Sequence, residues 1–171
     1  MEIERKFTIK QLPENLADYS YHLIEQAYLN TNPVIRIRRE DDRYYMTYKG
    51  GGLMAREEYN LPLNADAYAH LLPKADGNVI SKKRYLIPIK TPCFSSDATP
   101  PCDLQTLPGD YQPTIELDVF APPFDGLIIA EVEFPSIEAA NAFIPPAWFD
   151  KDVTNDPAYH NSNLSKKVFS V

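Results

Sequence analysis

Charged residues spaced two apart recur in five short segments of this 171-residue chain, each with apolar residues between or beside them. Two is the side-chain period of a β-strand, so an extended segment with this spacing has one charged face and one apolar face. Few folds accommodate several strands of this kind. The five sets are Glu2, Glu4 and Lys6; Arg36 and Arg38; Lys82 and Arg84; Glu116 and Asp118; and Glu131 and Glu133.

Two arrangements satisfy this pattern. In a sandwich, the charged faces meet water and the apolar faces meet the core. In a curled sheet, the charged faces line a lumen, where basic side chains hold a polyanion and carboxylates hold its cation. Like charges side by side repel unless an opposite charge lies between them. Because two sets are purely basic and three are acidic or mainly acidic, the pattern favours the lumen.

Eight segments have the composition of strands, and turn-forming residues separate several of them. Eight strands can close a barrel. Asn64 can cap a helix that runs through Lys74, and Ser136 can cap one that runs through Phe143. Two further short helices are expected near 11–20 and 156–167, and the proline-rich stretch 91–113 is expected to be a long surface excursion. The expected strands are 2–10, 24–30, 33–40, 43–50, 55–61, 79–89, 114–121 and 127–134.

Composition excludes several classes of protein. The formal net charge of −7 argues against a broad nucleic-acid interface, which needs a basic surface. No run approaches the roughly 20 apolar residues of a membrane span, and no apolar signal region follows Met1, so we expect a cytoplasmic protein. In that compartment Cys93 and Cys102 are expected to be free thiols, and no Cys or His spacing indicates zinc.

Several segments of the chain resemble the CYTH proteins, also called triphosphate tunnel metalloenzymes. Glu2-Ile3-Glu4-Arg5-Lys6-Phe7 is similar to the N-terminal ExExK signature of that family. The stretch 142–149, with 153–156 and 159–161, is similar to its short bacterial inorganic triphosphatases. The other matching segments follow in the family's order: Gln26-Ala27-Tyr28-Leu29, Arg36-Ile37-Arg38, Tyr48-Lys49-Gly50, Arg56-Glu57-Glu58-Tyr59, Lys82-Lys83-Arg84-Tyr85, residues 115–120 and Glu131-Val132-Glu133-Phe134.

The resemblance implies an α+β, mainly β fold: a closed eight-stranded antiparallel barrel, the triphosphate tunnel, with a few flanking helices. A single domain would span residues 1–171. The implied activity is metal-dependent hydrolysis of tripolyphosphate to pyrophosphate and phosphate, with Mg²⁺ or Mn²⁺ as cofactor. The expected partner is tripolyphosphate or another small molecule that carries a triphosphate, with no nucleic acid and no membrane. A homodimer is compatible with the sequence, which does not fix the oligomeric state.

Residue chemistry and the resemblance together assign roles. Arginine's planar fork can hold two phosphate oxygens, lysine supplies a movable charge, and Mg²⁺ takes hard oxygen ligands. Glu116 and Asp118 could orient the attacking water or hold a second metal ion, and Tyr28 could contact phosphate or water. The expected substrate-binding residues are Lys6, Arg36, Arg38, Lys49, Arg56, Glu58, Lys82 and Arg84; the metal ligands are Glu2, Glu4, Glu131 and Glu133; and the catalytic residues are Glu116, Asp118 and Tyr28.

Strand alternation also predicts which neighbours face outward. Adjacent strand residues point to opposite faces, so Glu57 and Glu58 cannot both enter the lumen, and the resemblance favours Glu58. By the same rule Lys83 faces away from Lys82 and Arg84.

Other activities remain open for such a tunnel. Thiamine triphosphatase, nucleoside triphosphatase and class IV adenylate cyclase could use the same charges. A polyphosphate- or nucleotide-binding module without turnover is a further alternative, although binding alone would not need so many carboxylates.

Overall fold

One antiparallel sheet of ten strands dominates the computed structural model, which describes residues 1–97, 107–109 and 111–169. The strand order is β12-β1-β10-β9-β7-β2-β3-β4-β6, and β5 pairs with β1 off this path. The strands are β1 (Glu2–Ile9), β2 (Tyr21–Thr31), β3 (Val34–Glu40), β4 (Arg43–Lys49), β5 (Ala55–Arg56), β6 (Glu58–Leu63), β7 (Asp76–Pro88), β9 (Thr114–Phe120), β10 (Ile128–Glu133) and β12 (Phe149–Asp152).

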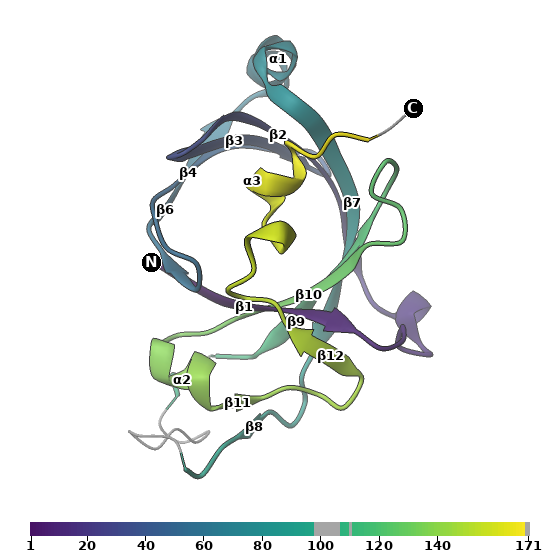
Figure 1. The fold of residues 1–171 in the computed structure, drawn as a ribbon, viewed down its shortest axis with the longest axis vertical. Coiled ribbons are helices and arrows are strands. Elements are labelled where there is room, and N and C mark those ends of the chain that lie inside the picture. Colours follow the sequence, from purple (N-terminus) through teal and green to yellow (C-terminus); the bar gives the residue numbers. More distant parts are fainter. Residues whose placement is uncertain (98–106, 110, 170–171) are drawn as a thin grey trace.

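The sheet curls into a nearly closed barrel (Figure 1), as the sequence predicts, but with a different strand count. The expected strand at 55–61 is broken at Glu57 into β5 and β6. β6 pairs with β4, and β5 closes the ring through Ala55, opposite Ile3, and Arg56, opposite Glu2. β12, which alternation did not reveal, pairs with the same edge of β1 as β5 but further along the strand, at Phe7 and Ile9.

Two of the expected helices form with the expected caps. The Oδ1 atom of Asn64 accepts a hydrogen bond from the Ala67 amide at 2.8 Å, and α1 (Ala65–Leu71) continues into the 3-10 turn η2 (Leu72–Lys74). The hydroxyl of Ser136 accepts one from the Ala139 amide at 3.1 Å and starts α2 (Ile137–Ala142). A side-chain acceptor at this position satisfies an amide that has no partner within the helix.

The other two expected helices are wrong as stated. Within 11–20 only a three-residue 3-10 turn forms, η1 (Leu16–Asp18). The expected helix at 156–167 is split into η3 (Pro157–Tyr159) and α3 (Asn161–Leu164). The split occurs because His160 is extended, with φ −82° and ψ 130°, so that no continuous helix passes through it.

Part of the proline-rich excursion is structured. β8 (Cys93–Phe94) pairs with β11 (Phe143–Ile144) in a separate two-stranded sheet. Strands of two residues carry no alternation that a sequence could reveal. Cys93 is an exposed free thiol, whereas Cys102 and the rest of the excursion at 98–106 and 110 lie outside the described residues.

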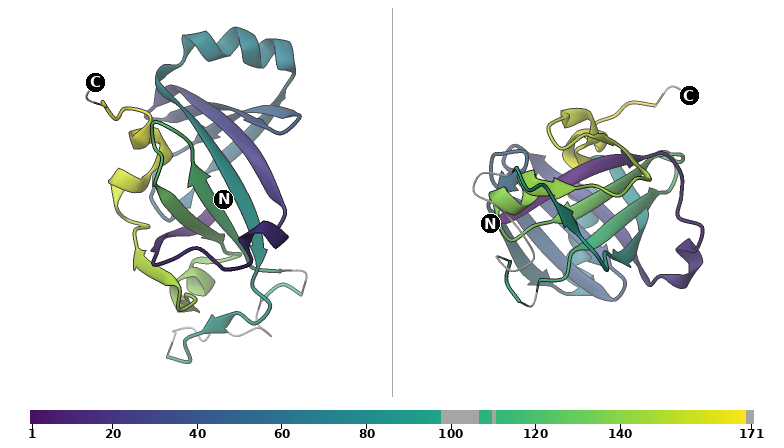
Figure 2. Two further views of the ribbon diagram at one scale, coloured as in Figure 1. Left: turned by 90° about the vertical axis from the view of Figure 1, so that its right-hand side faces the viewer. Right: turned by 90° about the horizontal axis from the view of Figure 1, so that it is seen from below.

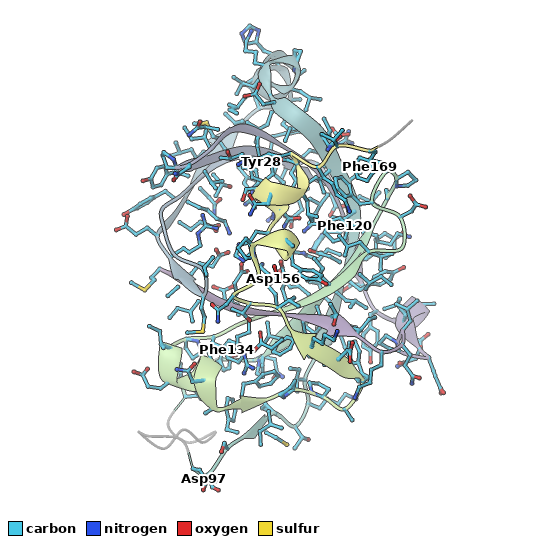
Figure 3. The ribbon with its side chains drawn as sticks, in the orientation of Figure 1. Tyr28, Asp97, Phe120, Phe134, Asp156 and Phe169 are labelled. Carbon is cyan, nitrogen blue, oxygen red and sulfur yellow. The ribbon has the colours of Figure 1, made fainter. Side chains whose placement is uncertain are left out.

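The largest hydrophobic cluster lies outside the ring, between the sheet and α2. Figure 3 places Phe134 there, below the ring. A second cluster, with Ala27, Ile37 and Tyr68, lies under α1. The apolar faces of the strands therefore turn outward against covering elements, and their charged faces turn inward.

The C-terminal segment, defined as Asp156–Lys167, lies across one end of the barrel (Figures 1 and 2). Leu164 of α3 is 6% exposed and packs with Val34, Ile80 and Phe120, which form an apolar layer at this end of the interior. Asn78 of β7 holds the segment further, because its side-chain amide donates to the Lys167 carbonyl at 2.7 Å. Within the described residues, no helix combines the length and apolar character that a membrane crossing requires.

Candidate active site: a charged tunnel

Four strands show how the interior changes from apolar to charged. Starting from the apolar layer under Leu164, each strand presents an apolar residue and then charged ones two and four positions away, forward along β3, β7 and β10 and backward along the antiparallel β9. The tunnel therefore has an apolar end, which the C-terminal segment covers, and a charged remainder, called the charged body. The sequences are Val34, Arg36 and Arg38 on β3; Ile80, Lys82 and Arg84 on β7; Phe120, Asp118 and Glu116 on β9; and Ile129, Glu131 and Glu133 on β10.

A cavity of about 310 Å³ occupies the charged body. Its lining combines cations and carboxylates from strands that are distant in sequence. The lining residues are Glu2, Glu4, Lys6, His22, Arg36, Arg38, Glu40, Tyr45, Lys49, Glu58, Arg84, Leu86, Glu116, Glu131, Glu133 and Asn161.

Carboxylates face one another across β1, β10 and β9. Glu4 is directly opposite Glu133, and Glu131 is directly opposite Glu116. Lys6 offsets part of this repulsion, because its Nζ lies 2.7 Å from Glu4 Oε1 and 2.5 Å from Glu131 Oε1. Among the described residues Glu133 has no cationic partner. Partial desolvation raises its pKa although the side chain remains accessible, and the nearby carboxylates of Glu116 and Glu4 raise it further.

Arg84 organises the β9 side of the tunnel. Its Nε donates to Asp118 Oδ1 at 2.7 Å, its Nη2 donates to Glu131 Oε2 at 2.5 Å, and its Nη1 contacts Glu116. Asp118 is fully buried and also pairs with Lys82. Burial alone would raise the pKa of Asp118, but Arg84 and Lys82 lower it. Asp118 therefore lies behind two cations and does not line the cavity.

Lys49 of β4 contacts one carboxylate on β1 and one on β6. Its Nζ lies 2.5 Å from Glu2 Oε2 and 2.7 Å from Glu58 Oε2. Burial and the neighbouring Glu4 raise the pKa of Glu2 to about 7, although Lys49 opposes this. For Glu58, burial acts to raise the pKa, but Lys49 and a hydrogen bond to Glu2 lower it to about 2. One proton is thus held preferentially on Glu2.

The β3 side of the tunnel is basic, and carboxylates neutralise it only weakly. Arg36 is 4% exposed, and its Nη2 donates to Thr47 Oγ1 at 3.1 Å. Within the described chain no carboxylate pairs with it, and its Nε has no hydrogen-bond partner. Arg38 donates to Gln26 Oε1 at 2.9 Å, and its nearest carboxylate is Glu40 at 3.8 Å. Burial and the adjacent Arg38 lower the pKa of Arg36, as expected for a buried cation that lacks a counter-ion.

Most of the site residues expected from the sequence meet in this interior, but not all of them line the main cavity. Tyr28 and Arg56 line a smaller cavity beside the C-terminal segment, and the Arg56 Nη2 donates to the Gly50 carbonyl at 2.9 Å. Lys82 and Asp118 are buried behind the cavity wall. As alternation predicts, Glu58 lines the cavity and Glu57 is exposed.

Several lining residues were not expected from the sequence. Tyr45 lines the cavity, and Thr47 supports it from behind by accepting a hydrogen bond from Arg36; both share a face of β4 with Lys49, so the spacing of two could have revealed them. They were not predicted because their side chains are neutral, whereas the prediction relied on charged residues spaced two apart. Asn161 comes from the C-terminal segment, and no periodicity of the sequence places that segment at the tunnel.

Comparisons with known proteins agree with this geometry. A family model described as the CYTH domain matches residues 1–101. The chain is 34% identical over 172 residues to an inorganic triphosphatase of Nitrosomonas europaea, with 98% of each chain covered. The chain belongs to the CYTH family. It is also 30% identical to an inorganic triphosphatase of Acetivibrio thermocellus, with coverage of 98% of this chain and 95% of the relative.

A solved structure also resembles this CYTH chain. The crystal structure of the inorganic triphosphatase NE1496 superposes with a TM-score of 0.64 at 32% identity, and the match covers 98% of this chain and 96% of the other. The barrel, the tunnel and the C-terminal segment therefore lie within the matched region.

The carboxylates of the tunnel suit a divalent cation by donor type. CYTH triphosphatases are generally metal-dependent, and Glu2, Glu4, Glu131 and Glu133 offer the oxygen ligands that Mg²⁺ and Mn²⁺ prefer. The opposed pair of Glu4 and Glu133 would be stabilised by a cation between them. In the described residues, no three acidic, His or Cys side chains are arranged around a common point, and Lys6 and Lys49 engage three of these carboxylates.

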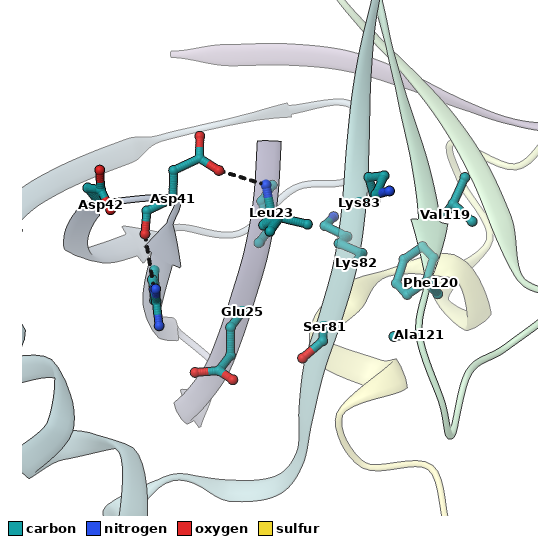
Figure 4. Close-up of a pocket in the computed structure, with 12 residues that line it drawn as sticks. Leu23, Glu25, Asp41, Asp42, Ser81, Lys82, Lys83, Val119, Phe120 and Ala121 are labelled. Carbon is teal, nitrogen blue, oxygen red and sulfur yellow. Dashed lines mark hydrogen bonds between the residues drawn. The ribbon is translucent and has the colours of Figure 1, made fainter. Parts of the chain in front are cut away.

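A second hollow, of about 680 Å³, lies between β2, β7 and β9 (Figure 4). Leu23 and Val119 contribute to its mainly apolar wall, and Asp41 accepts a hydrogen bond from the Leu23 amide at 2.9 Å. It lacks the opposed carboxylates of the tunnel. The chemistry expected of the charged sets therefore belongs to the main cavity of about 310 Å³ inside the barrel.

Proposed function

We propose that this chain is a metal-dependent inorganic triphosphatase that cleaves tripolyphosphate to pyrophosphate and phosphate. The observation that carries the proposal is a single cavity of about 310 Å³ with Arg36 and Arg38 on one side and opposed carboxylates on the other. An anion with several charges would neutralise the arginines, and a cation bound with it would neutralise the carboxylates. The two full-length relatives named inorganic triphosphatase support the same activity.

The basic residues would bind the phosphates from several directions. Among the described residues no carboxylate pairs with Arg36, and Arg38 pairs only with Glu40, at 3.8 Å, so these two guanidinium groups are the first contacts for phosphate oxygens. Lys6, Lys49 and Arg84 already hold carboxylates and would share their charge with the substrate. A ring of cations fits a short chain of phosphates better than it fits one isolated phosphate.

Hydrolysis would depend mainly on positioning and charge. A water oxygen bonds to a terminal phosphorus atom, the bond to the bridging oxygen breaks, and pyrophosphate leaves with its charge stabilised by the surrounding cations. Glu116 lines the cavity and is the acid that we assign to orient this water. Asp118 is assigned a positioning role, because it holds Arg84 and Lys82 from behind.

A divalent ion would be held by Glu2, Glu4, Glu131 and Glu133, which fit it by donor chemistry. When bound, it would supply positive charge against the phosphates and the opposed carboxylates. Replacing Glu133 by Gln should remove most turnover while the fold persists, because Glu133 is exposed and makes no ion pair within the described residues. Ile137→Ala, at an exposed site on α2, is the control and should keep the native rate. A native rate in the Glu133 variant would contradict its assignment as a ligand.

The decisive experiment compares tripolyphosphate, ATP and thiamine triphosphate side by side, with Mg²⁺ or Mn²⁺ and with excess chelator. We expect phosphate release to be fastest from tripolyphosphate and absent in chelator. Preference for ATP or thiamine triphosphate would identify a nucleoside or thiamine triphosphatase, and cyclic AMP in the ATP reaction would identify a cyclase. Binding without release would indicate a non-catalytic module. The cytoplasmic location and a homodimer stay predictions.

A further inference from the structure

A small chamber lies beside the C-terminal segment and next to the main cavity. Its volume is about 30 Å³, and five of its lining residues also line the main cavity, so the two spaces share a wall. The chamber is lined by Glu4, Lys6, Tyr28, Val34, Arg36, Lys49, Arg56, His160, Asn161 and Ser162.

Two residues of this lining carry complementary polar atoms. Arg36 Nε is a donor and Asn161 Oδ1 is an acceptor, and each is buried without a hydrogen-bond partner in the described chain. An unsatisfied buried polar group costs about 1–3 kcal/mol, so native structures normally satisfy such groups with protein or with water. One molecule within hydrogen-bond distance of both atoms would satisfy both.

The size of the chamber selects the molecule. A cavity needs roughly 10–15 Å³ of accessible volume to hold one water molecule, and two to four polar partners to retain it. The chamber meets both conditions. It is too small for a phosphate, which would have to remain in the main cavity of about 310 Å³.

The position of Asn161 connects this water to the substrate. Asn161 is the one residue of the C-terminal segment, in its described part, that lines both spaces. Arg36 does the same from β3. A water that accepts from Arg36 Nε and donates to Asn161 Oδ1 keeps a second hydrogen for another acceptor.

We propose that Arg36 and Asn161 hold a water molecule in this chamber, and that this water donates a hydrogen bond to the innermost phosphate of the substrate. The substrate contact rests on the triphosphatase function proposed above. Asn161 is thus a positioning residue that acts through water. The C-terminal segment becomes part of the substrate site, in addition to covering one end of the barrel.

A pair of asparagines in one helix provides a matched test. In Asn161→Leu the acceptor is lost and the chamber is filled, so the KM for tripolyphosphate should rise about three- to tenfold, the value of one ordinary hydrogen bond, with kcat changed less than twofold. The melting temperature without ligand should not fall by more than that of the control. The control is Asn163→Ala, whose side chain donates to the Pro157 carbonyl at 2.8 Å and lines neither cavity; it should lower the melting temperature and leave KM unchanged.

Either of two kinetic outcomes would overturn the proposal: a native KM in both Asn161→Leu and Asn161→Ala, or an equal rise in KM for Asn163→Ala. A high-resolution crystal structure of the ligand-free protein tests the water without reference to activity. We expect a water within hydrogen-bond distance of Arg36 Nε and Asn161 Oδ1, and a chamber filled by a side chain would refute it. Loss of the proposed function alone would appear differently, as a native protein that contains this water and does not hydrolyse tripolyphosphate.

Discussion

Two neighbouring arginines on β3 point to opposite faces of the sheet, one into the lumen and one to the surface. Comparing them tests the charged lumen directly. Arg38 is 7% exposed and lines the cavity, whereas Arg39 is exposed and donates to the Asp41 carbonyl at 3.0 Å. Arg38→Ala should reduce kcat/KM for tripolyphosphate about tenfold to a hundredfold, the effect of losing a hydrogen bond to a charged group. Arg39→Ala should change it less than about twofold. Steady-state kinetics on both variants, with thermal melts to verify folding, would falsify the lumen if the two losses were equal and small.

His160 gives the protein a stability that depends on pH. Burial lowers its pKa below the usual 6.5, and Lys6 acts in the same direction, while the hydrogen bond to the Thr154 carbonyl opposes the shift. Below about pH 6.5 the unfolded chain therefore binds a proton that the native protein resists, so the free energy of unfolding falls as the pH decreases and this contribution is constant above that range. Urea unfolding between pH 5 and 8 should show a weaker decline in His160→Gln. Parallel curves for the two proteins would contradict the assignment.

Residue by residue, the sequence predicts which charge lies on which face of a strand, but it does not predict how deeply a side chain is buried behind the cavity wall. Alternation separates Glu58 from Glu57 and Lys82 from Lys83, because each inward choice forces its neighbour outward. It cannot distinguish Asp118, buried behind two cations, from Glu116, which reaches the cavity, because both share one strand face. Depth depends on how the strands cross, and this is set by the whole barrel.

At the scale of elements, long strands are predictable and short ones are not. β3 and β4 have seven residues each, enough to display a period of two, whereas β8 and β11 have two residues each. The capped helices α1 and α2 carry their start signals at Asn64 and Ser136. The C-terminal segment has no sustained hydrophobic period and no continuous helix, because it is split into η3 and α3. Its position over the barrel therefore follows from packing alone.

Leu164 should anchor the C-terminal segment. It is 6% exposed and packs into the apolar layer with Tyr28 and Phe120. Leu164→Ala should lower the free energy of unfolding by about 2–5 kcal/mol, because buried contacts are lost and a cavity remains. Val168→Ala, at a site that is 90% exposed, is the control and should change it by less than about 0.5 kcal/mol. Equal effects in urea unfolding would show that α3 does not depend on this contact.

For the molecule as a whole, substrate and stability should be linked. Among the described residues Arg36 has no counter-ion and Glu4 lies opposite Glu133, and these costs are relieved when a polyanion and a cation bind together. Tripolyphosphate at about 100 times its dissociation constant should stabilise the native protein by roughly 2.7 kcal/mol if it binds only that state. A thermal melt should therefore shift upward with tripolyphosphate and much less with sulfate at equal ionic strength. An unchanged melting temperature at millimolar tripolyphosphate would argue against a preformed site.

Two of the three hydrophobic clusters lie outside the ring, which separates most of what holds the protein together from the charged part of the tunnel. Replacing an inward side chain changes the charge of the lumen but leaves the packing beneath α1 and α2 in place. Interior variants of this protein should therefore tend to lose activity before they lose stability, and some, such as Arg36→Met, should become more stable as they lose it. Such a barrel can be modified from within toward other polyanions, because its wall tolerates changes that a conventional packed core would not.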